Sequence, residues 1–395
     1  MLSSLKFITG PRRQRVAVAG FALAFLFLLA HASFAQAPDP QQLFRKASEA
    51  QQRGEATLAV RKYQELLRLY PDMTAAHANL GVLLVSLGRF DEAIEQDRAA
   101  LAQAPGNPAL RLNLALAYYK KGDFASATEQ LGPLHENEPD NLRLATLLGN
   151  CYVHLGRDDE AISLLMPFEQ ANSGNLDLEW ALGSALIRVG RTQEGVERVE
   201  KVAEGGQSAE AYMLAAQSRL KRGDLEPARR NYDAAMRLDP NLPGLHTLGG
   251  MIMDYTGDRK GAMTAYQMGL KANPNDFEAR LRLGVLLYDQ RQLDAAAEQL
   301  HRALQLDPTS RVARYELARV ERAQGQEEAA AKDLEEVVRA EPDWLPPHIE
   351  LASLYYRLKR PEDGAREKQI VDRLTEVERQ LRTKSHIISP PPPSH

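Results

Sequence analysis

The fold of this chain is decided by a stretch of 34 residues that recurs along it. One copy, residues 74–107, reads TAAHANLGVLLVSLGRFDEAIEQDRAALAQAPGN, and the next, residues 108–141, reads PALRLNLALAYYKKGDFASATEQLGPLHENEPDN. Working outward from these two copies, prolines recur in steps of 34 residues at 71, 105 and 139, and again at 240, 274, 308 and 342. The interval between Pro139 and Pro240 is 101 residues, one short of three such steps, which indicates a single deletion. The spacing predicts ten repeats: 40–73, 74–107, 108–141, 142–175, 176–208, 209–242, 243–276, 277–310, 311–344 and 345–378.

Two positions of the repeat hold a small residue in every copy. Position 8 is Ala or Gly in all ten repeats, as in Gly81 and Ala115, and so is position 20, as in Ala93 and Ala127. Position 15 is Gly in eight repeats. Positions 4, 7, 8 and 11, and positions 20, 24 and 27, form two helical stripes. Each repeat is therefore expected to be a helix, a left-handed glycine turn and a second helix, and stacking of the repeats buries their faces.

This pattern resembles the tetratricopeptide repeat family over nearly the whole chain. The residues that match the signature of that family include Leu148, Gly149, Tyr152, Gly156, Ala161 and Phe168, and further along Ala228, Tyr232 and Pro240. The resemblance implies an all-α fold, a right-handed α-solenoid of about ten helix-turn-helix repeats. It also implies that the first helix of each repeat (helix A) lines a concave, protein-binding surface and that the second (helix B) lies outside it.

The chain departs from the family pattern at several positions. Position 4, often aromatic in the family, is Arg111, Arg280 or Arg314 here, and position 15 is Arg291 and Lys359 in two repeats. The fifth repeat, 176–208, is one residue short and lacks the proline. We interpret this irregular repeat either as a hinge or as simple decay of the repeat.

A second stripe on helix A supplies the candidate binding residues. Positions 5, 9 and 12 lie about a third of a turn from the packing stripe, and only three of their thirty residues are charged. An apolar, tyrosine-rich groove is suited to an extended or helical protein segment. The alternative is that these residues partly pack on the next repeat. The groove candidates are Phe44, Leu112, Leu116, Tyr119, Trp180, Ile187, Met213, Leu220, Met251, Leu281, Tyr288, Tyr315, Arg319, Arg322, Ile349 and Tyr356.

The N-terminus predicts export. Residues 1–35 hold four basic and no acidic residues, an apolar run over 16–30, and small residues at Ser33 and Ala35, as in a signal peptide cleaved after Ala35. Cleavage would remove four positive charges and take the net charge from −4 to −8. We therefore expect a periplasmic or secreted protein; the alternative is an uncleaved membrane anchor. Cys151 is the single cysteine, and we expect a buried, inert thiol.

No motif indicates an enzyme. The chain lacks GxxxxGK[ST], HExxH, CxxC and GxSxG, and no stretch outside the repeats could hold a catalytic domain. We expect no catalytic residue, no metal and no cofactor, and the acidic balance argues against nucleic-acid binding. His77, His246 and His348 occupy position 4, where packing is the simplest role.

The predicted function is a protein-interaction scaffold. One alternative is a repeat subunit of a cell-envelope or polysaccharide-export assembly, and another is a solenoid that binds a small ligand or glycan. The excess of 36 Arg over 13 Lys is typical of GC-rich genomes and suggests a bacterial source.

The C-terminus has two predicted parts. Residues 361–383 read as an extended capping helix with Ile370, Leu374, Val377 and Leu381 at 4-3-4 spacing, and the alternative is a short helix that forms a homodimer. Residues 384–395 read as a disordered Pro-rich tail.

Overall fold

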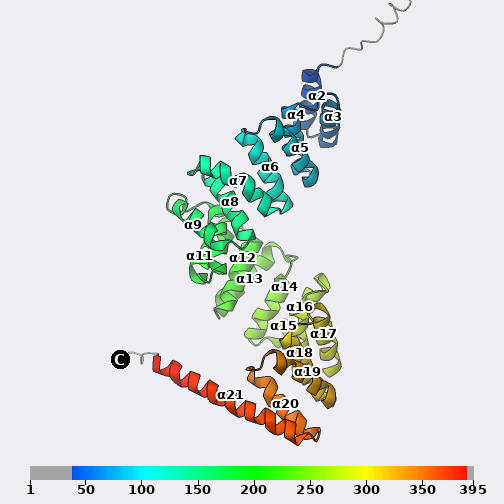
Figure 1. Cartoon of the computed structure of the whole chain (residues 1–395), viewed down its shortest axis with the longest axis vertical. Helices are drawn as coiled ribbons and strands as arrows, with labels where there is room; N and C mark the ends of the chain where they lie inside the picture. The colour runs from blue at the N-terminus through cyan, green and yellow to red at the C-terminus, as the bar shows by residue number, and fades with distance from the viewer. Residues whose placement is uncertain (1–37, 389–395) are drawn as a thin grey trace, which may run out of the picture. The chain divides into compact units, whose positions relative to one another are not determined.

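The computed structural model describes residues 38–388 and contains helices but no strand over that range (Figure 1). The chain divides into two compact bodies, one ending at Arg157 and the other beginning at Asp158, and each is described by itself. The first body contains α2 (Pro40–Gln52), α3 (Ala56–Leu69), α4 (Thr74–Ser86), α5 (Phe90–Gln103), α6 (Pro108–Lys121), α7 (Phe124–Asn137) and α8 (Leu142–His154). The signal peptide expected over 1–35 lies outside the described residues.

The second body contains the remaining helices. They are α9 (Asp158–Glu169), α10 (Leu176–Arg188), α11 (Thr192–Gly206), α12 (Ala209–Lys221), α13 (Leu225–Leu238), α14 (Leu245–Tyr255), α15 (Arg259–Ala272), α16 (Phe277–Asp289), α17 (Leu293–Leu306), α18 (Arg311–Ala323), α19 (Glu327–Ala340), α20 (Leu345–Arg357) and α21 (Pro361–Ile388). Even-numbered helices from α2 to α20 are the A helices of the ten repeats, and odd-numbered ones are the B helices.

Position 15 ends helix A with a left-handed residue in all ten repeats. The eight glycines there have φ between 72° and 87°, which confirms the predicted glycine turn. Arg291 and Lys359 adopt the same conformation, with φ of 62° and 57°. The geometry of the turn therefore imposes the left-handed backbone, and glycine is only its least strained occupant.

At six of the nine junctions between repeats, the side chain of the last residue of a repeat caps helix A of the next one. The side chain of Asn107 accepts a hydrogen bond from the backbone N–H of Ala109 at 2.9 Å, and that of Ser310 accepts one from Ala313 at 3.2 Å. The same role is played by Asn141, Asn175, Ser208 and Asp276. These side chains satisfy N–H groups that the first turn of a helix leaves unpaired.

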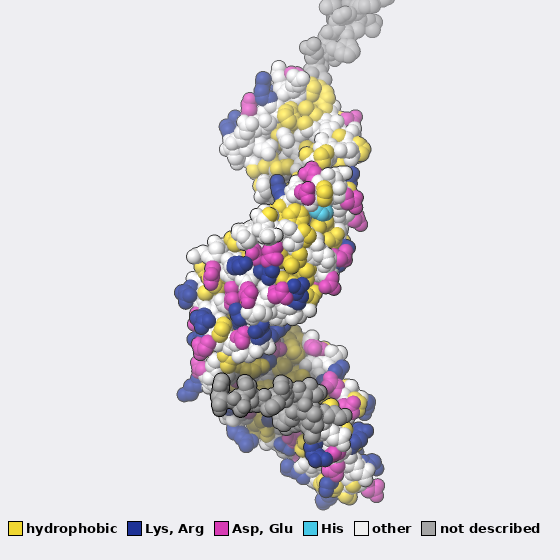
Figure 2. All heavy atoms as spheres, turned by 90° about the vertical axis from the view of Figure 1, so that its left-hand side faces the viewer, with side chains coloured by type: hydrophobic (Ala, Val, Ile, Leu, Met, Phe, Trp, Pro, Cys, Tyr) yellow, Lys and Arg dark blue, Asp and Glu magenta, His cyan; other side chains and the backbone are white. Residues whose placement is uncertain are grey.

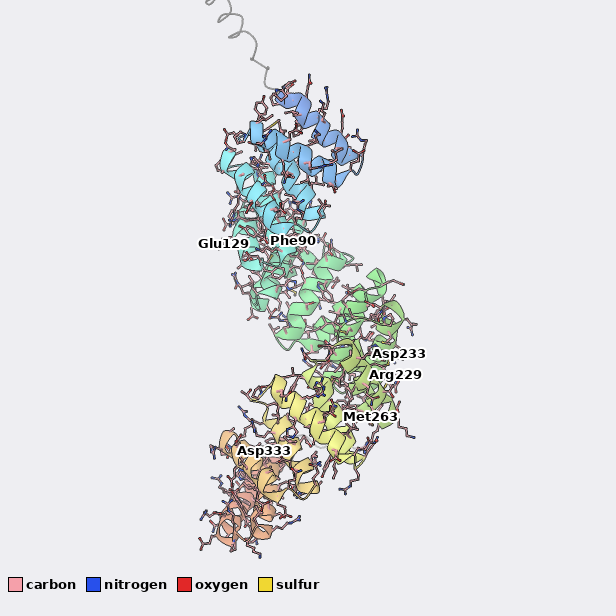
Figure 3. All side chains as sticks on the ribbon, turned by 90° about the vertical axis from the view of Figure 1, so that its right-hand side faces the viewer. Phe90, Glu129, Arg229, Asp233, Met263 and Asp333 are labelled. Atoms are coloured by element: carbon pink, nitrogen blue, oxygen red, sulfur yellow. The ribbon has the colours of Figure 1, made fainter. Side chains whose placement is uncertain are left out.

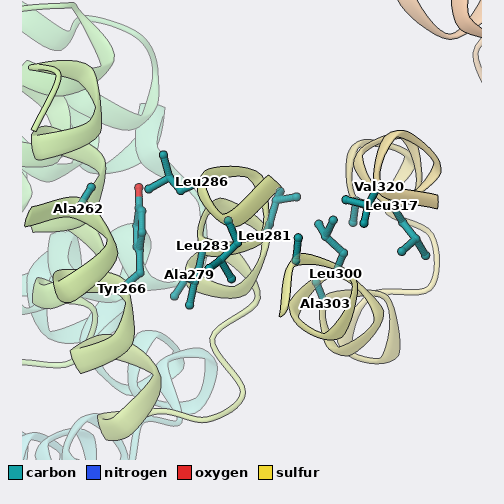
Figure 4. Close-up of a cluster of buried hydrophobic side chains, with 13 residues drawn as sticks. Ala262, Tyr266, Ala279, Leu281, Leu283, Leu286, Leu300, Ala303, Leu317 and Val320 are labelled. Atoms are coloured by element: carbon teal, nitrogen blue, oxygen red, sulfur yellow. The ribbon is translucent and has the colours of Figure 1, made fainter. Parts of the chain in front are cut away.

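The small residues allow close helix packing, as predicted. A Cβ atom on Gly250 would lie 2.5 Å from the ring of Tyr266, and one on Gly284 would lie 2.8 Å from Cγ of Leu300. All ten residues at position 20 are buried. Positions 3 and 10, which the sequence stripe omitted, are also buried in nine repeats of ten. Figure 4 shows two of them, Ala279 and Leu286, in the apolar cluster that extends from α15 to α18.

Position 4 forms a polar link between helix A, the loop that precedes it and helix B of the same repeat. Arg280 donates a hydrogen bond from Nε to the carbonyl oxygen of Pro274 at 3.0 Å and another from Nη1 to Oε1 of Gln299 at 2.9 Å. His77, Arg111, Arg314 and His348 contact the equivalent proline carbonyl and the side chain 19 residues further on. The packing role expected for His77 and His348 is thus a hydrogen-bonded one.

Two helices depart from the regular pattern. α14 begins at Leu245, the third residue of its repeat, because Pro243 and Gly244 form the preceding turn and Gly244 is left-handed with φ of 81°. α21 continues to Ile388, so the predicted start of the tail at 384 is wrong for residues 384–388. No proline or glycine interrupts that stretch, and the first helix-breaking residue is Pro390. Over residues 38–388, no helix is long and apolar enough to span a membrane.

Candidate functional site

The structure places most of the predicted groove residues half-buried on helix A. This holds for Leu112, Leu116, Met213 and Met251, among others, and the ring of Phe44 meets that of Tyr63 edge-on at 6.0 Å. Trp180 and Ile187 pack against the core formed by α11 and α12. Both readings of this stripe therefore apply, because each side chain uses part of its surface for packing and presents the rest to solvent.

Two candidates, Leu220 and Leu281, are buried. Leu281 is buried in the apolar cluster of Figure 4, beside Leu300 and Leu317. Its helix, α16, lies between α15, α17 and α18, so even a position on the second stripe is covered there. Leu281 belongs to the core, and we withdraw it as a contact for a partner.

Six other candidates lie on three consecutive A helices and form what we call the aromatic–arginine surface. It consists of Tyr288 on α16, Tyr315, Arg319 and Arg322 on α18, and Ile349 and Tyr356 on α20. Ile349 and Tyr356 are each about half exposed, although both are large side chains. These exposed groups are therefore available to a partner without any rearrangement of the fold.

Arg319 organises the centre of this surface. Its guanidinium carbon lies 4.6 Å from the ring centroid of Tyr288 and 5.9 Å from that of Tyr315, within the range of cation–π contacts. The same guanidinium donates a hydrogen bond to Glu316 at 2.5 Å. Trp344 extends the aromatic contact, with its ring centroid 4.9 Å from that of Tyr315. The arginine thus holds rings from two repeats in fixed positions.

The charges on this surface are balanced by neighbours. Burial lowers the pKa of Arg319, but Glu316, Tyr288 and Tyr315 together raise it by more, so the net shift is upward. Burial raises the pKa of Glu316, and Arg319 opposes that rise. Arg322 pairs with Glu350 of the next A helix. The surface therefore presents aromatic faces and aliphatic groups with paired charges between them.

A cavity of about 910 Å³ lies between α12 and α14. Its apolar lining includes Leu220, Leu225, Leu248 and Met251, of which Leu220 and Met251 were predicted groove residues. Lys221 and Tyr255 also line it, and both side chains are exposed. The late start of α14 explains the space, because Pro243 and Gly244 replace the helical residues that the other repeats have at positions 1 and 2.

Sequence reasoning missed some exposed apolar residues of helix A. Tyr255, at position 13, is 58% exposed, and the stripe of positions 5, 9 and 12 did not include it. Position 13 lies one helical turn beyond position 9, so the same periodicity could have identified it. Val82, at position 9 of the second repeat, lies on that stripe and is also exposed, although it is not among the groove candidates. Among residues 38–388, no group of three or more His, Cys, Asp or Glu side chains could hold a metal ion.

Charged side chains are arranged differently on many of the B helices. Arg229 and Asp233 pair at 3.1 Å on α13 (Figure 3), and Arg302 pairs with Glu298 at 2.8 Å on α17. Such pairs between residues three or four apart are typical of a solvated helix surface. On the face drawn in Figure 2, apolar side chains gather in runs bordered by charged ones.

Two models of one sequence family match the chain. A tetratricopeptide repeat model matches residues 44–108, 112–166, 181–243 and 254–311, and a second model of the same repeat matches residues 287–344. The matched residues make up more than half of the chain. Residues 244–253 fall outside the matches, and they hold most of α14 and the residue before it. No curated protein sequence matches the chain.

Two of the following three solved structures match with TM-scores of at least 0.50 and share the fold. A tetratricopeptide repeat protein from Parabacteroides merdae ATCC 43184 is 17% identical, with a TM-score of 0.51 over 63% of this chain and 98% of that one. The APC/C hetero-tetramer Cut9-Hcn1 gives 16% identity and a TM-score of 0.50 over 91% of this chain and 79% of that one. MamA (41-end) from Desulfovibrio magneticus RS-1 gives 26% identity and a TM-score of 0.39 over 44% and 96%.

Proposed function

The chain belongs to the tetratricopeptide repeat family, and we propose that it is a non-catalytic scaffold that binds a segment of a partner protein on its aromatic–arginine surface. Repeats of this family typically bind protein partners. The observation that carries the proposal is the contact of Arg319 with Tyr288 and Tyr315, beside the half-exposed Ile349 and Tyr356.

The composition of this surface supports a protein partner. Tyrosine, tryptophan and arginine are the residues most enriched at the energetic centres of protein interfaces. Tyr288 and Tyr315 are already ordered by Arg319, so binding would cost little additional side-chain entropy. Because Arg319 and Arg322 have carboxylate partners, the surface favours apolar and aromatic groups of the partner over a bare carboxylate or phosphate.

The proposal includes export of the protein. The basic residues before an apolar run over 16–30 and the small residues at Ser33 and Ala35 support it. N-terminal sequencing of the protein isolated from its source tests this part, and we expect the sequence to begin at Gln36. A chain that still begins at Met1 would favour the uncleaved anchor.

An affinity capture tests the binding surface. The double variant Ile349→Ser, Tyr356→Ser changes two exposed residues of the aromatic–arginine surface, so the fold should be kept. A matched control, Met268→Ser, Leu306→Ser, changes two exposed apolar residues of B helices in the same body. A partner captured by the wild type and by the control, but lost with the surface variant, supports the proposal once its direct binding is shown with purified protein. Equal capture by all three baits would contradict it.

A further inference from the structure

We infer that the cavity between α12 and α14 receives the exposed end of α21 from a second copy of this chain, so that copies associate head to tail. This inference goes beyond the proposed function, because it concerns another surface and a partner of known sequence. It joins two features that the repeat architecture leaves unexplained: an apolar cavity on helix A and an apolar helix face without a partner in its own chain.

The cavity has an apolar lining and one unpaired cation. Of its four charged side chains, Arg222 pairs with Asp224 at 3.1 Å and Glu278 with Arg282 at 2.7 Å. Asp276 accepts hydrogen bonds from the hydroxyl of Thr247 at 2.7 Å and from the backbone N–H of Ala279 at 3.0 Å. Lys221 is the remaining charge among these described residues. The complementary occupant is therefore an apolar group with a carboxylate beside it.

The end of α21 has this chemistry. Beyond Leu374, which is buried, Val377 and Leu381 are 48% and 62% exposed and lie one helical turn apart. Glu378 is adjacent to Val377 and three residues before Leu381, so it borders the same face of the helix. An amphipathic helix commonly binds a groove through apolar anchors at this spacing, with charges at the edge. Val377 and Leu381 supply the anchors, and Glu378 supplies the carboxylate for Lys221.

A second copy is the appropriate source of this helix. α21 is one helix from Pro361 to Ile388, and Figure 1 shows it as a single rod that extends past α20. Neither proline nor glycine occurs from Ala365 to Ile388, so the end of α21 would have to break its helix to fold back into the cavity of its own chain. Pairing of two α21 helices through Ile370, Leu374, Val377 and Leu381 has less support, because Leu374 is already buried and Ile370 half-buried in their own chain.

This mode of association has a definite symmetry. The cavity and the helix end are different surfaces, so the contact is heterologous and a bound pair still offers one free cavity and one free helix end. The mass of the assembly should therefore rise with protein concentration, whereas a two-fold dimer would stop at twice the mass of the chain. Sedimentation velocity over a range of concentrations separates these cases.

Charge reversal tests the contact. Lys221→Glu and Glu378→Lys each place like charges in the proposed contact, and we expect each variant alone to remain monomeric where the wild type associates. Mixing the two variants restores opposite charges at every contact, and we expect association to return. Leu381→Glu should weaken association about tenfold or more, because it removes an apolar anchor. Leu306→Glu, at another exposed leucine, is the matched control and should associate as the wild type does.

The outcomes separate the hypotheses. A wild type that stays at the mass of one chain at every concentration overturns the inference, and so does a variant mixture that remains monomeric. A wild type that stops at a dimer overturns the head-to-tail contact in favour of pairing between two α21 helices. None of these results bears on the aromatic–arginine surface, which the Ile349 and Tyr356 variant tests separately.

Discussion

The carboxylate of Asp97 lies directly against Gly81, so closely that a Cβ atom on residue 81 would come within 2.1 Å of Oδ1. Asp97 is only 1% exposed and neither of its carboxylate oxygens has a hydrogen-bond partner in the structure. In eight of the other nine repeats the same position holds an apolar or aromatic side chain, and Leu300 and Tyr266, for example, pack on the small residue at position 8. The second repeat thus has a carboxyl group where its neighbouring repeats have an apolar or aromatic core side chain.

Asp97 should make the stability of the second repeat depend on pH. Burial raises the pKa of Asp97 from 3.8 to about 7, so the folded state favours the neutral acid. The effect of Asp97 on the free energy of unfolding is therefore smallest below about pH 4, and its ionisation lowers stability increasingly as the pH rises towards 7. We expect Asp97→Asn, which cannot ionise, to gain about 2–4 kcal/mol over the wild type between pH 4 and pH 8. Hydrogen exchange of the α4 and α5 amides at several pH values measures the stability of both proteins. A difference between Asp97→Asn and the wild type that does not change with pH would contradict the prediction.

Overpacking at position 20 should destabilise the chain. Ala330 is fully buried, whereas its neighbour Ala329 on the same helix is exposed. We expect Ala330→Leu to cost about 1–3 kcal/mol, because the added atoms force α18 and α19 apart. Ala329→Leu, with the same change in composition and helix propensity, should be nearly neutral. Denaturant unfolding measures the free energy of unfolding of both variants. Equal losses of stability would show that the predicted repeat register is wrong.

The left-handed residues Arg291 and Lys359 should be sites of strain. Both have a Cβ atom in a backbone region that side chains disfavour. We expect Arg291→Gly to stabilise the protein by up to about 1 kcal/mol, and Gly223→Val, at the equivalent turn, to destabilise it. Differential scanning calorimetry of the two variants provides the measurement. A loss of stability with Arg291→Gly would mean that the arginine side chain contributes more than the strain costs.

The polar link at position 4 should appear as an energetic coupling. Arg280 is buried and joins the carbonyl of Pro274 to Gln299. Arg280→Leu leaves both acceptors unpaired, and we expect a cost of about 1–3 kcal/mol. A double-mutant cycle with Gln299→Leu should show the two losses to be non-additive by about 1 kcal/mol. The seventh repeat has Ala265 in place of this acceptor side chain, so His246→Leu should cost less than Arg280→Leu.

Cys151 should be unreactive until its helix unfolds. The thiol is fully buried, and burial raises its pKa to about 11, so almost no thiolate exists at neutral pH. We expect a disulfide reagent at pH 8 to label the native protein slowly and the denatured protein rapidly. Fast labelling of the native protein would show that α8 opens readily.

The sequence predicted the repeat register and its turns because these depend on local chemistry. Gly at position 15 and Ala or Gly at position 20 satisfy constraints within one helix pair. The burial of positions 3 and 10, and of Leu281, depends on neighbouring repeats, and a periodicity within one helix does not contain that information. The cavity was also not predicted, although Pro243 and Gly244 are visible signals for a helix that starts late.

The cap at position 34 and the polar link at position 4 both cross the boundary between consecutive repeats. Asn107 and Ser310 stand in one repeat and cap a helix of the next, and Arg280 bonds the carbonyl of Pro274 in the repeat before its own. A duplication or excision of 34 consecutive residues keeps these contacts in phase where the joined repeats carry a capping residue at position 34 and an Arg or His at position 4, whereas most other lengths place them out of phase. The 33-residue fifth repeat keeps its cap because Ser208 is still its last residue. Gain or loss of whole repeats therefore keeps the contacts at such junctions in register, and the 34-residue repeat is the unit by which the length of the chain can change.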